Sequence, residues 1–156
     1  MKVTMIYAST TDGLIGDGMK LPWHIKEDFA HFVKYTKGKP VLMGSTTAKT
    51  LPNGPLPNRT NYVLTTRCLR NYGRPHSDGF HYINSYKEIP ECDELMIIGG
   101  AQIYEHFEPI CQKIIWTEVI GDYSGDTYYK PKMPWANRTL LGESTCGRAK
   151  FWEMTR

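Results

Sequence analysis

Short apolar runs alternate along the chain with segments of helical periodicity. The apolar runs are rich in β-branched residues, which predicts strands, and they lie at residues 3–8, 40–43, 62–65, 80–83, 94–98 and 113–120. Helical patterns and helix-start signals between these runs predict helices at 25–37, 45–51 and 101–107, and a capping-box pattern at 85–88 predicts the start of another. Two further strands, at 138–141 and 148–154, are expected to form a hairpin.

This alternation predicts an α/β fold. We expect a mostly parallel twisted central sheet with helices on both faces and an antiparallel C-terminal edge. The length of 156 residues fits one domain, so we expect a single domain over residues 1–156.

The first predicted helix carries an acidic residue on its apolar side. Ile25, Phe29, Phe32 and Val33 form one stripe along it, and Asp28 falls within that stripe. Burying a carboxylate costs several kcal/mol, roughly, unless a cation or a hydrogen-bond donor meets it. No basic residue shares its face within one helical turn, so the partner comes from elsewhere in the fold or is a ligand.

Two interpretations of this acidic residue stay open at this point. Asp28 is either a boundary residue that reaches water or pairs with a distant arginine, or the polar anchor of a ligand pocket. The second is supported by the neighbouring run Leu21-Pro22-Trp23-His24, whose bulky side chains end a glycine-rich loop. A lone carboxylate on an apolar wall predicts a pocket for a flat ligand with hydrogen-bond donors on its edge.

Composition narrows the class of protein. The net charge is only +3, from 19 basic and 16 acidic residues, which does not favour nucleic-acid binding. The cysteines (Cys68, Cys92, Cys111 and Cys146) form no CxxC pair and no metal-ligand spacing with histidine, so we expect free thiols and no metal site. The sequence shows no signal peptide and no apolar run of membrane-spanning length, so we expect a cytoplasmic protein without a membrane partner.

Two predicted strand ends are suited to a phosphate-bearing ligand. Gly44 and Gly99-Gly100 each follow a strand and precede a helix start, where unpaired backbone N–H groups favour anions. A third strand end offers Thr65, Thr66 and Arg67, two hydroxyls and a cation. The chain lacks a GxGxxG segment after its first strand and a Walker sequence, and a Gly-Gly pair after a strand is often only a tight turn.

Together these motifs resemble a known family over nearly the whole chain. The matching segments are Ile6-Tyr7-Ala8, Gly13-Leu14-Ile15-Gly16, Leu21-Pro22-Trp23, Asp28 with Phe32, Pro40-Val41-Leu42-Met43-Gly44, Thr47, Leu56-Pro57-Asn58-Arg59, Ile98-Gly99-Gly100 with Ile103-Tyr104, Thr117, and Gly125-Asp126-Thr127. In this combination and at these separations the sequence resembles the dihydrofolate reductases.

The resemblance implies reduction of the small-molecule substrate 7,8-dihydrofolate to 5,6,7,8-tetrahydrofolate by hydride transfer from NADPH, by a protein that is a monomer. Asp28, Trp23, Leu21 and Thr117 are implied as catalytic residues. Asp28 would bind the pteridine, Thr117 would support it, Trp23 would hold a water, and Leu21 lies in the loop over the nicotinamide.

The resemblance also implies two sets of binding residues. Those expected at the substrate are Ile6, Ala8, Asp28, Phe29, Phe32, Thr50, Leu56, Arg59, Ile98 and Thr117. Those expected at the cofactor are Ala8, Ile15, Gly16, Gly44, Ser45, Thr46, Thr47, Thr65, Thr66, Arg67, Ile98, Gly99, Gly100, Ala101, Gln102, Ile103 and Tyr104.

The sequence departs from the family pattern on the cofactor side. Ser45 and Gln102 stand where many members carry a basic residue, which leaves Arg67 as the clearest cation for the 2′-phosphate and weakens the expected preference for NADPH. Two alternatives are a pyrimidine reductase of riboflavin synthesis, with the same fold and cofactor, and a non-catalytic relative with a binding or structural role. Asp28 with Trp23 and Arg59 argues against the first, and the intact Asp28, Thr117 and Gly-Gly set argues against the second.

Overall fold

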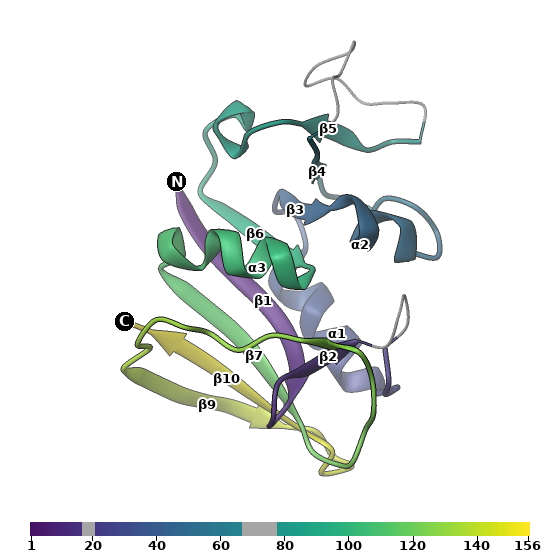
Figure 1. Ribbon diagram of the computed structural model, residues 1–156, viewed down its shortest axis with the longest axis vertical. Coiled ribbons are helices and arrows are strands. Elements are labelled where there is room, and N and C mark those ends of the chain that lie inside the picture. The colour runs from purple at the N-terminus through teal and green to yellow at the C-terminus, as the bar shows by residue number, and fades with distance from the viewer. Residues whose placement is uncertain (17–20, 67–77) are drawn as a thin grey trace.

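A computed structural model describes residues 1–16, 21–66 and 78–156 of the chain, and Figure 1 shows its arrangement. The helices are α1 (Lys26–Thr36), α2 (Ser45–Thr50) and α3 (Ala101–Phe107), with 3-10 turns η1 (Tyr86–Glu88) and η2 (Glu108–Ile110). The strands are β1 (Lys2–Thr10), β2 (Leu14–Gly16), β3 (Val41–Gly44), β4 (Asn61–Leu64), β5 (His81–Ile83), β6 (Glu94–Gly99), β7 (Lys113–Val119), β8 (Thr127–Tyr128), β9 (Asn137–Glu143) and β10 (Ala149–Thr155).

Within the described ranges, eight strands form one sheet in the order β5-β4-β3-β6-β1-β7-β10-β9. All pairings from β5 to β7 are parallel, whereas β10 runs antiparallel to both β7 and β9. The predicted fold class is therefore confirmed, including the antiparallel C-terminal edge. The register places Ala8 of β1 opposite Thr117 of β7, so these two residues meet in the middle of the sheet.

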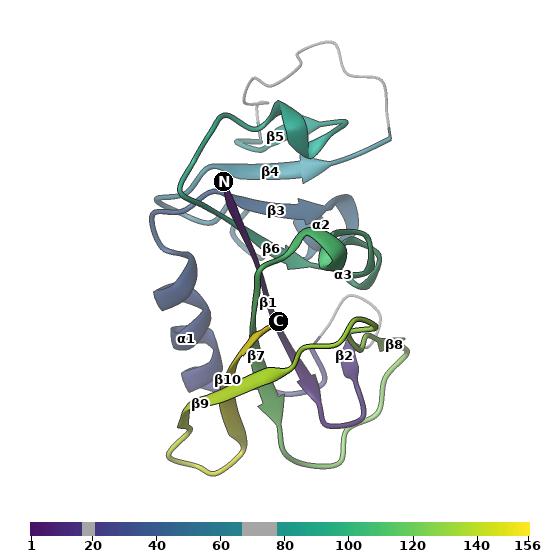
Figure 2. The same cartoon turned by 90° about the vertical axis from the view of Figure 1, so that its left-hand side faces the viewer.

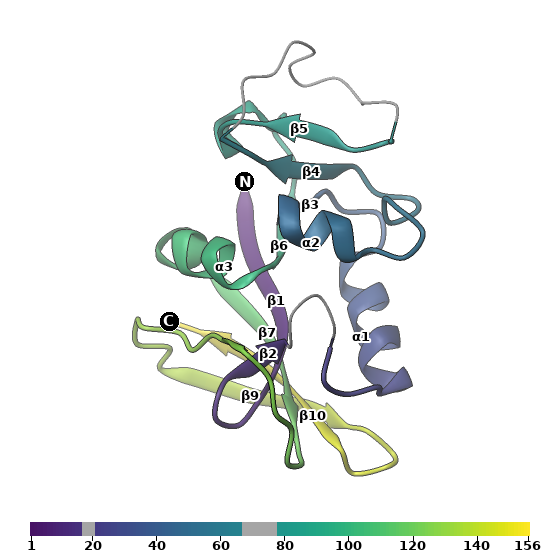
Figure 3. The same ribbon diagram turned by 45° about the vertical axis from the view of Figure 1, so that its right-hand side comes forward.

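The central strands are covered on both sides. Helices α1 and α3 lie on opposite faces, as the two turned views show (Figures 2 and 3). Side chains alternate along β1: Met5 and Tyr7 join the core cluster that contains Phe107 of α3, and Ile6 joins a second cluster against which Phe32 of α1 packs. This two-residue period, with helices above and below, explains why the parallel strands are apolar on both faces.

Several predicted elements differ in the structure. Strand β1 continues to Thr10, beyond its predicted end at residue 8. The helix expected from residue 85 is only the single turn η1, although Ser85 caps it by accepting a hydrogen bond from the Lys87 N–H at 3.3 Å. The chain is already extended at Ile89, and Pro90 follows, so no longer helix forms.

The two short strands β2 and β8 were not predicted. They pair with each other outside the main sheet, and backbone hydrogen bonds from Asp126 N to Gly16 O (3.1 Å) and from Tyr129 N to Gly13 O (2.8 Å) extend their contact. Elements of two and three residues are too short for a period to be visible. The pairing brings the segment after β7 against the glycine-rich loop.

The described helices include none that is long and apolar enough to cross a membrane.

Candidate active site

A cleft of about 1540 Å³ lies at the carboxyl ends of the parallel strands. It is lined by β1, by the ends of β3, β4 and β6, by β7, and by residues of all three α-helices. This is where open α/β sheets bind ligands, because loops and helix starts diverge there.

Asp28 lies in the first turn of α1 and lines the cleft. Thr117, which is 2% exposed, donates a side-chain hydrogen bond to its carboxylate from β7. Burial raises the pKa of Asp28 above its ordinary value, and the bond from Thr117 lowers it by less. Among the described residues Asp28 makes no ion pair, and its side chain lines the cleft.

Trp23 and Leu21 enclose the cleft before α1 begins. Trp23 is 5% exposed and packs edge-on against the Tyr123 ring at 5.7 Å. Its indole Nε1 is buried and makes no hydrogen bond within the described part of the chain, so this N–H group is available as a donor to a water molecule or a ligand. Leu21 is 63% exposed and lines the cleft from the loop side.

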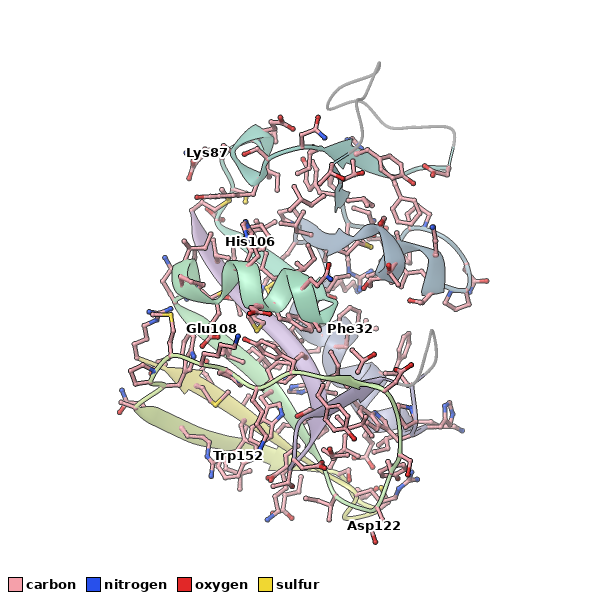
Figure 4. All side chains as sticks on the ribbon, in the orientation of Figure 1. Phe32, Lys87, His106, Glu108, Asp122 and Trp152 are labelled. Carbon is pink, nitrogen blue, oxygen red and sulfur yellow. The ribbon has the colours of Figure 1, made fainter. Side chains whose placement is uncertain are left out.

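The apolar wall of the site comes from strands and from α1. Ile6 and Ile98 are buried, and Phe32 is half-buried; Figure 4 shows Phe32 in the middle of the molecule. Phe29 also lines the cleft, and its side chain is 66% exposed. The α1 face that meets the sheet runs through Phe32 and Thr36.

Thr50 and Leu56 line the part of the cleft near the end of α2. Arg59 lies beside the cleft and is not part of its lining. The Arg59 Nε donates to Thr36 Oγ1 at 3.1 Å and its Nη1 to the Pro57 carbonyl at 2.5 Å. These bonds hold the guanidinium next to the Pro57 side of the cleft, and burial lowers the pKa of Arg59.

Two glycine segments form the opposite half of the cleft. Gly44 ends β3 before α2, and Gly99 ends β6 and is joined by a cis peptide bond to Gly100, which precedes α3. Gly99 has φ +130°, and a Cβ there would lie 3.1 Å from the Tyr104 hydroxyl, so both backbone and space require glycine. The neighbouring residues that also line this half are Ser45, Thr46, Thr47, Ala101, Gln102 and Ile103.

Tyr104 fixes these two halves to each other. Its hydroxyl donates to the Ile6 carbonyl at 3.0 Å, which ties α3 to β1 beneath the cleft. Burial raises its pKa, with further increases from Tyr7 and Asp28. Tyr104 is therefore a neutral donor at physiological pH.

The remaining predicted cofactor residues lie around the same opening. Ala8, Ile15, Gly16, Thr65 and Thr66 line the cleft. Arg67, the cation expected near a 2′-phosphate, lies outside the described residues. The structure thus brings together every predicted site residue that it describes except Arg59, which lies beside the cleft.

Other cleft residues were missed from the sequence. Tyr7 lies between Ile6 and Ala8 in the sequence and also lines the cleft, and His31 lies one helical turn after Asp28. The i, i+3 spacing from Asp28 is the signal that could have found His31. Its ring stacks on Phe151 at 4.2 Å, and burial, with the nearby Lys34, lowers its pKa to about 4.

Comparisons with known proteins agree with this geometry. The family model described as dihydrofolate reductase matches residues 2–145. The chain belongs to the dihydrofolate reductase family. It is 33% identical over 135 residues to the Haemophilus influenzae dihydrofolate reductase, covering 86% of this chain and 82% of that one. It is 37% identical over 130 residues to the Neisseria gonorrhoeae dihydrofolate reductase, covering 83% and 79%.

A solved dihydrofolate reductase has the same fold. The structure from Enterococcus faecalis, complexed with NADP(H) and RAB-propyl, superposes with a TM-score of 0.83 at 25% sequence identity, covering 99% of this chain and 96% of that one. These findings support the dihydrofolate reductase prediction over the riboflavin pyrimidine reductase and the non-catalytic relative. Within the described residues of this dihydrofolate reductase family member, no group of three or more His, Cys, Asp or Glu side chains is placed to hold a metal ion.

Proposed function

We propose that this chain catalyses the reduction of 7,8-dihydrofolate to 5,6,7,8-tetrahydrofolate with NADPH. The observation that carries the proposal is Asp28, a buried carboxylate that faces a large apolar cleft and is held there by Thr117. Membership of the dihydrofolate reductase family supports the same reaction.

Asp28 is proposed to bind the amino edge of the pteridine. A carboxylate has two oxygens and accepts two parallel hydrogen bonds, which matches a ring that presents an amino group beside a ring N–H. The two pteridine donors favour the charged form of Asp28, whereas burial favours its neutral form. Substrate binding is therefore expected to lower the pKa of Asp28. Asp28 thereby polarises the bound ring.

The proton needed at pteridine N5 is proposed to arrive from a water molecule. The Trp23 Nε1 is a buried donor without a partner among the described residues, and it is suited to hold such a water near the Asp28 wall. Ile6, Ile98 and Phe32 exclude bulk water from the ring plane. Arg59 lies beside the cleft and is proposed to pair with the substrate's glutamate carboxylate.

The opposite half of the cleft fits a dinucleotide. A Cβ at Gly44 would lie 3.1 Å from Ile103 Cγ1, and one at Gly99 would meet Tyr104, so glycine at both positions lets α3 pack closely against the ends of β3 and β6. Ser45, Thr46 and Gln102 supply neutral hydrogen-bond donors around it. NADPH supplies the hydride when bound, so the protein's task is alignment and exclusion of water.

We further propose that the protein is one domain, a monomer and cytoplasmic. The single domain is supported by β1, which lies between β6 and β7, and by β10, which joins the same sheet from the far end of the sequence. The cytoplasmic location is supported by the free thiols of Cys92, Cys111 and Cys146, which suit a reducing compartment.

A steady-state assay tests the function. Loss of absorbance at the nicotinamide band is followed with dihydrofolate and either NADPH or NADH, with a control that lacks dihydrofolate. We expect dihydrofolate-dependent oxidation with a preference for NADPH. Cofactor oxidation that requires a ribosylated pyrimidine instead, or none with either substrate, would contradict the proposal.

A further inference from the structure

A second cavity, of about 320 Å³, lies between the sheet and the segment that follows β8. Its lining includes Tyr7 of β1, Trp116 of β7 and Met154 of β10 on the sheet side, and Tyr129, Met133 and Trp135 on the segment side. Its volume is at the lower end of the range for small-ligand sites. The role proposed above for the large cleft does not use this cavity.

The segment that covers this cavity is held firmly. Glu108, at the end of α3, is 2% exposed and accepts hydrogen bonds from Tyr129 Oη (3.1 Å), Lys132 N (2.9 Å), Met133 N (2.8 Å) and Trp135 Nε1 (2.9 Å). Figure 4 shows Glu108 beside this segment. Because these four donors converge on one carboxylate, the cavity has a preformed wall rather than a loose loop over it.

The cavity walls are aromatic and suited to a flat ring. The Tyr7 and Trp116 rings are 6.5 Å apart and inclined by 27°, and the Tyr129 ring meets Tyr7 edge-on at 5.3 Å. The thioethers of Met133 and Met154 add polarizable contacts that favour aromatic partners. These surfaces complement a planar aromatic molecule of one or two fused rings.

One lysine lies at the rim of the cavity. Of the described side chains that line it, Lys130 alone carries a charge. A Cβ at Gly13 would lie 2.9 Å from Lys130 Cγ, so glycine there lets the lysine stem lie along the opening. The hydroxyls of Ser9 and Thr11 already donate, to the Thr10 carbonyl and to Glu118, which leaves the Lys130 ammonium as the group for an anionic substituent.

The cavity and the cleft share a wall. Tyr7 lines both, and its ring lies 5.4 Å from that of Tyr104, whose hydroxyl holds the Ile6 carbonyl beneath the cleft. In addition, Tyr129 N donates to Gly13 O, at the start of the loop that continues to Ile15 and the cleft. A molecule that moves Tyr7 or Tyr129 therefore acts on two contacts of the cleft.

We propose that this cavity is a second ligand site for a planar aromatic carboxylate, and that Tyr7 couples its occupancy to ligand binding in the cleft. The ring stacks against Trp116 and Tyr7, and the carboxylate pairs with Lys130. The coupling rests on the proposed function, since it concerns folate binding, whereas occupancy of the cavity does not.

The first test measures binding to the full chain with the cleft saturated by folate and NADP⁺. The probe is indole-3-carboxylate, with the neutral isostere indole-3-carboxamide beside it, followed by ligand-observed NMR and calorimetry. We expect a Kd on the order of 1 mM for the carboxylate, as suits a ligand of this size, and binding about threefold weaker for the amide, as suits one exposed ion pair.

Variants assign that binding to the cavity. Lys130→Met should abolish the difference between acid and amide, whereas Lys132→Met, a matched change at an exposed lysine outside the lining, should keep it. Met133→Trp, which fills the cavity, should weaken both probes about tenfold or more. Binding that disappears when the cleft is saturated, or that is the same in Lys130→Met and the unchanged protein, overturns the site.

The coupling is measured as the folate Kd with and without saturating probe. We expect a change of about fivefold, in the range of ordinary coupling between sites, and an equal reciprocal change in the probe Kd. A folate Kd that the probe does not alter refutes the coupling. If the protein binds the probe but not folate, the proposed function is contradicted, whereas the proposal that the cavity binds an aromatic carboxylate still holds.

Discussion

Replacing Asp28 by asparagine is expected to lower the catalytic activity without lowering the stability of the protein. The amide keeps the size of the side chain and one acceptor oxygen, but it removes the charge and turns an N–H pair toward the donors of the pteridine. At least one charge-assisted hydrogen bond is lost, which costs about 1.5–3 kcal/mol. This corresponds to a decrease in kcat/KM of about 10- to 150-fold at 25 °C.

The same substitution should stabilise the protein without ligands. Burial raises the folded-state pKa of Asp28, so between the unfolded and the folded pKa the native state binds more protons than the unfolded state. Stability from this group is therefore present at low pH and is lost as pH rises through that window. At pH 7 the charged form disfavours folding, and Asp28→Asn removes that cost.

The assay pairs two measurements on the same preparations. Steady-state kinetics with dihydrofolate and NADPH are recorded from pH 5 to 9, and urea unfolding is recorded at pH 5 and 7 without ligands. We expect lower kcat/KM together with an equal or higher free energy of unfolding at pH 7. Near-full activity of Asp28→Asn at neutral pH would refute the role of the carboxylate, and a lower stability would refute the account of its burial.

Three further substitutions test neighbouring features. Thr117→Val should raise the pKa of Asp28 further and weaken folate binding about 10-fold or more, because a hydrogen bond to the charged form is lost; calorimetry against pH measures both. His31→Phe should remove a pH dependence of stability: the folded pKa near 4 lies below the ordinary 6.5, so stability falls as pH drops from 6.5 to 4, and unfolding curves should lose that slope. Glu108→Gln should lower the free energy of unfolding by about 2–4 kcal/mol, since an amide nitrogen then faces N–H donors; an unchanged urea midpoint would contradict the role of that carboxylate.

The elements that sequence reasoning found are those with long, regular patterns. The parallel strands and α1 show their periods plainly, and Asp28 could be singled out because one carboxylate broke an apolar stripe. The Gly99–Gly100 pair was located because it follows a predicted strand and precedes a helix start, whereas Thr117 was located only through the resemblance to dihydrofolate reductases.

What was missed depends on contacts between distant parts of the chain. Pairing of β2 with β8 joins residues 14–16 to 127–128, and no local pattern in either segment indicates the other. Glu108 looks like an ordinary helix-end acid until the fold brings four donors to it.

The position of β1 at the centre of the sheet has a consequence for biosynthesis. Its neighbours β6 and β7 are translated long after it, so the growing chain carries this apolar strand without its first partner until residue 99 and without its second until residue 119 has been made. Pairings this distant along the chain form slowly, and an unpaired apolar strand invites association with other chains. Nascent chains that stall before β7 are therefore expected to need chaperone protection, whereas the completed chain closes both edges of β1 at once.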